Sequence, residues 1–67
     1  MSETEIINKN PIEYIDITSN RKIEIFFKKC SHHYYNSGLS LIEDDIYDIL
    51  IDEYKKKNPS SNIFNLI

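Results

Sequence analysis

Two stretches of the chain carry a helical pattern of apolar residues. The first follows the polar cluster Thr18-Ser19-Asn20, whose residue types favour helix N-caps. The run IEIFF also alternates like a strand, but the helical stripe extends further and favours a helix. The end of this helix is predicted between Asn36 and Gly38, because Asn and Gly tolerate the left-handed backbone at a helix stop. The stripe consists of apolar residues spaced three or four apart: Ile23, Phe26, Phe27, Cys30 and Tyr34.

The second stretch predicts a helix that begins near Ser40 and ends at Asn58-Pro59. The segment from Ser40 to Glu43 matches the S-x-x-E capping box, in which the two side chains satisfy two free backbone amides. Three lysines, Lys55 to Lys57, fall in the last turn, where positive charge complements the helix dipole. The apolar stripe of this helix consists of Ile42, Ile46, Ile49, Leu50 and Tyr54.

The segments outside these two helices are less regular. Residues 1–10 are polar and are expected to form a flexible N-terminus, and residues 11–67 a single helical domain. Pro11 opens the run IEYIDI, which fits a short helix or an irregular docking segment. The predicted fold is all-α, with two main helices packed as a hairpin and the short N-terminal segment and apolar tail docked against them. The most buried side chains should be Ile23, Phe26, Phe27, Ile46, Ile49 and Leu50.

Length and composition narrow the class of protein. A chain of 67 residues holds one small domain, and its single cysteine, Cys30, excludes an internal disulfide. We therefore expect an intracellular, reducing compartment, without distinguishing a viral from a nuclear or cytoplasmic location. No apolar run approaches the roughly 20 residues needed to span a bilayer, so no membrane partner is expected. A net charge of -3 argues against the chain holding DNA phosphates by itself.

The candidate binding residues lie on both sides of the only glycine. The aromatic pair Tyr34-Tyr35 precedes Gly38, and Asp44, Tyr47 and Asp48 follow it at helical positions i, i+3 and i+4. Side chains at that spacing share a helical face, which predicts a small polar and aromatic pocket. An alternative is that the acidic residues only favour the helix N-terminus and that one tyrosine packs in the core.

Other reactive residue types give little support for catalysis. His32 and His33 are adjacent and so do not share a helical face, and no further ligand follows at metal-binding spacing. Cys30 fits the apolar stripe and is interpreted as a small core residue. We therefore predict neither a metal site nor a catalytic residue in this chain.

The stretch YYNSGLSLIEDDIYDILIDEYKKKNP resembles the N-terminal domain (domain Ia) of NAD-dependent DNA ligases. That family shows a helix ending in an aromatic pair, a short loop, the pattern Ile-Ser-Asp-x-x-Tyr-Asp and a helix with a proline near its end. The match needs no gap and covers about half the chain. It aligns Tyr34 and Tyr35 with the aromatic pair, Ile42 with the isoleucine, and Asp44, Tyr47 and Asp48 with the Asp, Tyr and Asp of the family.

The resemblance implies a role in binding the nicotinamide mononucleotide half of NAD. In the family, the aromatic pair stacks on the nicotinamide ring, and the Asp and Tyr residues contact its ribose, amide and phosphate. The implied partner is the adenylation domain of a ligase, in the same or a separate chain, with nicked DNA bound only through other domains. The family's Lys-x-Asp-Gly nucleophile motif is absent, so the chain alone should not be active.

Some features depart from the family pattern and keep other functions open. Glu43 replaces the usual small or proline residue, and the loop NSGLSL lacks an acidic-proline pair. The tail NPSSNIFNLI differs from the bacterial form and resembles divergent viral or eukaryote-type versions more closely. The alternatives are a helical protein-interaction module with no catalytic role and a small free-standing regulator that senses NAD. The apolar tail also suggests a segment taken from a longer protein.

Overall fold

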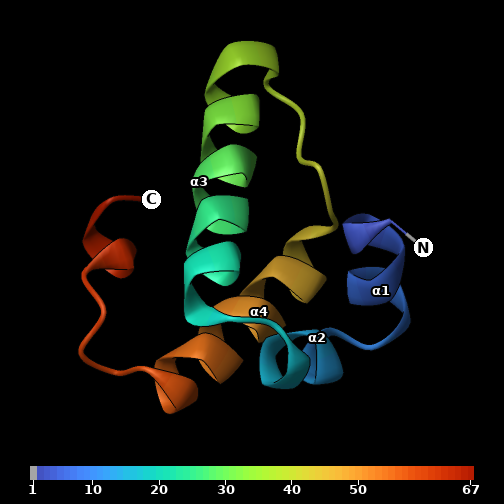
Figure 1. The fold of residues 1–67 in the computed structure, drawn as a ribbon. Helices are drawn as coiled ribbons and strands as arrows, with labels where there is room; N and C mark the ends of the chain where they lie inside the picture. The colour runs from blue at the N-terminus through green and yellow to red at the C-terminus, as the bar shows by residue number, and fades with distance from the viewer. Residues whose placement is uncertain (1) are drawn as a thin grey trace.

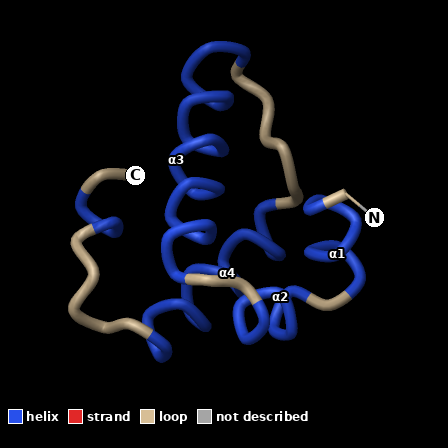
Figure 2. Tube along the Cα trace, in the orientation of Figure 1, coloured by secondary structure: helices blue, strands red, loops and turns tan. Residues whose placement is uncertain are grey.

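The computed structural model describes residues 2–67. Within that range every regular element is a helix and none is a strand (Figure 1, Figure 2). The all-α prediction is therefore confirmed. Four α-helices are followed by a short 3₁₀ helix near the C-terminus. Their bounds are α1 Glu3–Lys9, α2 Pro11–Ile17, α3 Asn20–Ser37, α4 Asp44–Lys57 and η1 Ile63–Asn65.

The boundaries of α3 follow from local side-chain and backbone chemistry. Ser19 is the N-cap, and its hydroxyl oxygen accepts a hydrogen bond from the backbone amide of Lys22. Gly38 ends the helix with φ of 73°, and its amide donates to the carbonyl of Tyr34. Both predicted ends of this helix are confirmed. The same holds for the end of α4, where Asn58 is the C-cap ahead of Pro59.

The N-terminal residues contain an additional short helix. Residues 3–9 form helix α1, capped by Ser2, and Ile7 is fully buried. The hydroxyl of Tyr14 in α2 donates to a carboxylate oxygen of Glu3 at 2.6 Å, which ties the two short helices together. The sequence pattern did not predict this helix, because seven residues are too few to show a helical period. The flexibility expected of the N-terminus stays a prediction. The domain boundary placed before Pro11 stays a prediction.

The second main helix begins later than the capping box predicted. Helix α4 starts at Asp44 with Glu43 as N-cap, and the Glu43 side chain accepts no hydrogen bond from the first turn. The segment from residue 38 to 43 returns from the far end of α3 as an irregular loop (Figure 1). Helix α4 then crosses the lower part of α3 instead of lying along its whole length. Both Tyr47 and Tyr54, two turns apart on α4, accordingly pack their rings against Phe27.

The core lies where α1, α2 and α4 meet the first half of α3. Four of the six residues predicted to be most buried, Ile23, Phe26, Phe27 and Leu50, are confirmed. Ile46 is half-buried, and Ile49 is 39% exposed, so the prediction for Ile49 was wrong. Adjacent helical residues diverge by about 100°, and the register that buries Leu50 turns Ile49 toward solvent. The other buried apolar residues are Ile7, Tyr14, Ile15, Cys30, Ile42, Tyr54 and Ile63.

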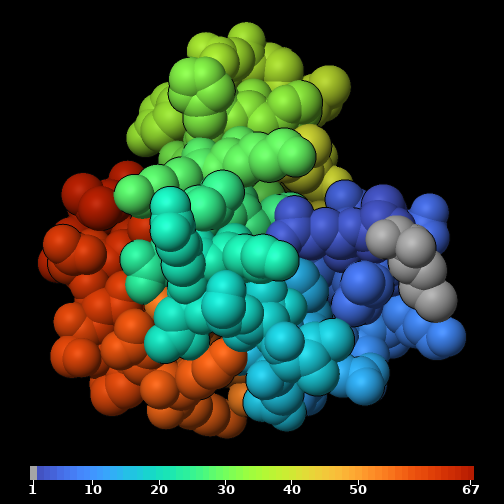
Figure 3. Space-filling model, in the orientation of Figure 1, coloured from blue at the N-terminus to red at the C-terminus, as the bar shows by residue number. Residues whose placement is uncertain are grey.

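Two long-range contacts close the ends of the domain. The ammonium group of Lys57 donates to the carbonyls of Ile15 and Thr18, at 2.6 and 2.8 Å, and joins α4 to the end of α2. Ile63 of the tail is fully buried, which confirms that the tail docks on the helices. Across residues 2–67, no helix is both long enough and apolar enough to pass through a membrane. The far end of α3 projects beyond this packed body in the space-filling view (Figure 3).

Candidate functional site

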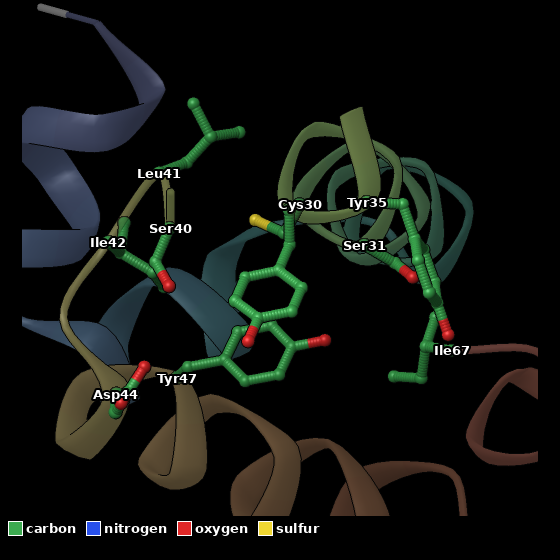
Figure 4. Close-up of a pocket in the computed structure, with 10 residues that line it drawn as sticks. Cys30, Ser31, Tyr35, Ser40, Leu41, Ile42, Asp44, Tyr47 and Ile67 are labelled. Carbon is green, nitrogen blue, oxygen red and sulfur yellow. The ribbon is translucent and has the colours of Figure 1, made fainter. Parts of the chain in front are cut away.

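A pocket of about 280 Å³ lies between the second half of α3, the loop that follows it, the start of α4 and the C-terminal tail (Figure 4). The first three of these segments follow one another in the chain, and the tail is brought to them from a distant part of the sequence. The pocket is mixed in character, with aromatic, aliphatic, hydroxyl, thiol and carboxylate groups on its walls. Its lining consists of Cys30, Ser31, Tyr34, Tyr35, Ser40, Leu41, Ile42, Asp44, Tyr47 and Ile67.

Four of the five residues singled out in the sequence lie around this pocket. They are Tyr34 and Tyr35 from α3 and Asp44 and Tyr47 from α4. Asp48 is exposed and is not part of the lining. At about 100° per residue, Tyr47 and Asp48 fall on opposite sides of Asp44, so the turn that brings Tyr47 inward moves Asp48 away.

The aromatic pair stands at the open rim of the pocket. Tyr34 is 57% exposed and Tyr35 is 84% exposed, because α3 extends beyond the helices that cover its first half. The alternative that one tyrosine of this pair packs in the core was therefore wrong. The two rings lie edge to face, with centroids 6.5 Å apart and an interplanar angle of 74°. Both rings are thus accessible to solvent beside the pocket.

Tyr47 forms the inner aromatic wall. It is half-buried, and its ring packs edge to face on Phe27, with centroids 5.9 Å apart. Figure 4 shows its side chain projecting from α4 into the pocket. Burial, and secondarily the nearby Cys30, raises the pKa of the Tyr47 hydroxyl above its ordinary value. The hydroxyl therefore stays protonated at neutral pH and is available as a hydrogen-bond donor.

Asp44 brings a carboxylate to the same side of the pocket as Tyr47, one turn earlier on α4. It is the first residue of α4 and is exposed to solvent. Negative charge at this position is stabilised by the positive end of the helix dipole, by about 0.3–1 kcal/mol. A carboxylate held there accepts hydrogen bonds from hydroxyl or amide groups of a ligand. Its place is explained by helix electrostatics and is equally suited to ligand binding.

The sequence did not indicate several members of the pocket. Ser31 is spaced three and four residues from Tyr34 and Tyr35, so helical periodicity alone could have included it. Ile67 has no such signal, because only the folding of the tail brings it to the pocket. Cys30 was predicted as a core residue and is indeed buried, yet it also lines the pocket. Burial raises the pKa of its thiol to about 11, which leaves it protonated and unreactive at neutral pH.

The chemistry available in the pocket is that of binding. Among residues 2–67, no group of three or more His, Cys, Asp or Glu side chains is arranged to hold a metal ion. The side-chain nitrogens of His32 and Asn36 lie 2.8 Å apart, one turn from each other on α3. Aromatic faces, a phenol donor and a carboxylate acceptor suit a flat, polar ligand better than they suit the breaking of a bond.

Comparison with known proteins relates the chain to one part of a much larger enzyme. Over 42 residues, which are 63% of the chain, the sequence is 52% identical to a DNA ligase of Acanthamoeba polyphaga mimivirus. This match covers 7% of the length of the viral ligase. No family model and no solved structure matches the chain. The chain is therefore related to a short segment of a DNA ligase.

Proposed function

We propose that this chain is the part of an NAD-dependent DNA ligase, corresponding to domain Ia, that binds nicotinamide mononucleotide and orients NAD for adenylation of the ligase lysine. One observation carries the proposal. Tyr34, Tyr35, Asp44 and Tyr47 line a single pocket in a chain that is related to a DNA ligase segment. The binding residues would be these four together with Asp48.

The aromatic pair fits the nicotinamide ring, which is flat and positively charged in NAD. The exposed rings of Tyr34 and Tyr35 offer stacking surface without first having to leave the core. Attraction between a cation and an aromatic face contributes about 0.5–2 kcal/mol. The ring would therefore bind at the open rim, next to the tyrosines.

The polar groups fit the remainder of the nucleotide. Tyr47 keeps its proton at neutral pH and would donate to the phosphate, whereas Asp44 would accept from ribose hydroxyls or the carboxamide. Carboxylates repel a phosphate, which favours this division of roles. Asp48, outside the pocket lining, would contact the part of the ligand that extends along α4.

The contribution to the reaction would be orientation and closure. In the proposed reaction, AMP passes from NAD to a lysine of the adenylation domain, and nicotinamide mononucleotide leaves. Holding the leaving group in line with the attacking lysine lowers the entropic part of the barrier. Closing the domain over the nucleotide excludes water from the site. The lysine and the DNA contacts would be supplied by other domains.

The test joins this chain to the adenylation domain of an NAD-dependent DNA ligase and follows formation of the AMP-lysine adduct from NAD. Asp44→Ala and Tyr34→Ala should abolish adduct formation, yet leave sealing of a pre-adenylated nick largely intact. Asp52→Ala is the matched control, because it removes an exposed carboxylate from α4 outside the pocket. It should react at the unmutated rate.

The competing function is a helical protein-interaction module without a catalytic role. The exposed apolar end of α3 and the following loop, with Tyr35 and Leu39, favours it. If Asp44→Ala and Tyr34→Ala both react with NAD at the unmutated rate, the pocket assignment is wrong and the interaction module becomes the better explanation.

A further inference from the structure

The C-terminal tail supplies one wall of the pocket. Ile67 lines it and is half-buried, although the rest of the lining comes from residues 30–47. Figure 4 shows Ile67 beside Tyr35 and Ser31, on the side of the pocket that faces away from Ser40 and Ile42. The pocket would therefore be open on this side without the tail.

Apolar contacts hold the middle of the tail in place. Ile63 is fully buried, and the ring of Phe64 packs on Tyr54 with centroids 5.8 Å apart. The ammonium group of Lys55, one residue after Tyr54 on α4, lies over the Phe64 ring at 5.3 Å from its centre. The backbone amide of Ile67 donates to the carbonyl of Ile63 at 3.2 Å, so the position of Ile67 depends on that of Ile63.

A polar junction holds the start of the tail. One carboxylate oxygen of Glu24, on α3, accepts hydrogen bonds from the hydroxyl of Tyr54, on α4, and from the hydroxyl of Ser61 at 3.0 Å. The Ser61 oxygen also accepts from the backbone amide of Ile63 at 3.2 Å. Ser61 thus links the first turn of η1 to Glu24 of α3, and the same carboxylate is also bonded to Tyr54 of α4.

We propose that the segment from Ser61 to Ile67 closes one side of the pocket, and that Ser61 and Glu24 are positioning residues that fix Ile67 against the bound nucleotide. The part of this inference that concerns the nucleotide rests on the function proposed above. The part that concerns the pocket wall does not, because it is a property of the chain without ligand. The two parts are tested by separate measurements.

The wall is tested by the accessibility of Cys30, the single thiol of the chain, which is buried and lines the pocket. Its rate of alkylation is measured at zero and at low urea, since labelling through local opening is nearly insensitive to urea whereas labelling through global unfolding is not. Ser61→Ala should label about tenfold faster, the order expected for losing a hydrogen bond to a charged group, with little dependence on urea. Glu24→Gln alters the acceptor of the same hydrogen bond, on α3, and should also raise the rate of Cys30 alkylation.

The matched control for the wall is Ser60→Ala, because Ser60 is exposed and, among residues 2–67, its hydroxyl donates to the side chain of Asn58 alone. It should label at the unmutated rate. Equal rates for Ser61→Ala and Ser60→Ala would overturn the proposal. So would a faster rate for Ser61→Ala that rises with urea as global unfolding does.

The ligand part is tested by titrating the chain with nicotinamide mononucleotide and following backbone amide shifts. Ile67→Ala and Ser61→Ala should raise Kd severalfold, whereas Leu66→Ala should not, because Leu66 is exposed and outside the pocket. Equal Kd values for all variants would overturn the positioning role while leaving the proposed function intact. Absence of binding by the unmutated chain would instead count against the proposed function, and the thiol measurement would still decide the role of the tail.

Discussion

Tyrosines have opposite environments in two regions of the molecule. One region is the packed base, where α1, α2 and α4 meet the first half of α3, and the other is the projecting end of α3, which forms the rim of the pocket. Tyr14 and Tyr54 are buried, and each donates its hydroxyl proton to a carboxylate, Glu3 for the first and Glu24 for the second. Tyr34 and Tyr35 are exposed, and their rings lie edge to face with each other. The same residue type thus completes the core in one region and offers free ring surface in the other.

The difference shows how a small domain separates stability from binding. A buried hydroxyl without a partner costs free energy, so the base supplies a carboxylate for each buried phenol. Rings at the rim bury little area and hence contribute little to folding. They are free to contact a ligand without loosening the core. Tyr47 lies between the two groups, with its ring on Phe27 and its hydroxyl at the pocket.

The largest expected effect is that of Phe27→Ala in the base. Phe27 is fully buried and packs against Tyr47 and Tyr54, so its removal should cost roughly 3–5 kcal/mol of unfolding free energy. For a domain this small, that loss should abolish the cooperative thermal transition. Ile25→Ala, on the exposed face of the same helix, is the control and should melt like the unmutated chain. A cooperative, unchanged melt for Phe27→Ala would contradict the assigned core.

Removing one buried hydroxyl should have the next largest effect. Tyr54→Phe keeps the ring but deprives Glu24 of a donor, and should lower the unfolding free energy by about 1.5–3 kcal/mol in urea denaturation. Tyr35→Phe removes a hydroxyl from the exposed pair and should change it by about 0.5 kcal/mol or less. Equal losses of unfolding free energy for Tyr54→Phe and Tyr35→Phe would contradict the separation of a stabilising base from a rim that contributes little to stability.

The pH dependence of stability should also depend on the buried titratable groups of the packed base, Cys30 and Tyr14. Burial raises the pKa of the Cys30 thiol from 9.0 to about 11, and burial with the Glu3 hydrogen bond raises the pKa of Tyr14. The folded chain therefore keeps protons that the unfolded chain releases. The contribution of the thiol is complete below pH 9 and is lost as pH rises toward 11, whereas that of Tyr14 begins to be lost only above pH 10. Thermal melts should show a falling transition temperature over that interval. Cys30→Ala should flatten the fall nearest pH 9, and an unchanged slope in this variant would exclude the thiol as its source.

A substitution at the rim should have the smallest effect on stability. Tyr35→Ala should change the unfolding free energy by about 0.5 kcal/mol or less, because its side chain is 84% exposed. The same variant should bind nicotinamide mononucleotide more weakly in the amide-shift titration, since it removes stacking surface. A large loss of stability with unchanged binding would reverse the proposed roles of rim and base.

Local sequence chemistry predicted those parts of the molecule that depend on neighbouring residues. The helix from Asn20 to Ser37 and its ends followed from a serine cap, a 3.6-residue period and a glycine stop, all of which act within a few residues. The pairing of Asp44 with Tyr47 also followed, because positions three apart on a helix lie on neighbouring surfaces. The fold class and four of the ten residues that line the candidate pocket were accessible in this way.

Contacts between distant segments decided the remainder. The stripe predicted for α4 included Ile49, but the register that buries Leu50 and Tyr54 turns Ile49 and Asp48 outward. Helices as short as α1 are marginal alone, and here Ile7 is buried in the core while Glu3 accepts a hydrogen bond from Tyr14 of α2. Ile67 joins the pocket because the tail folds back over the helices. These choices depend on burial energies summed over residues far apart in the chain, which a local period of 3.6 residues does not encode.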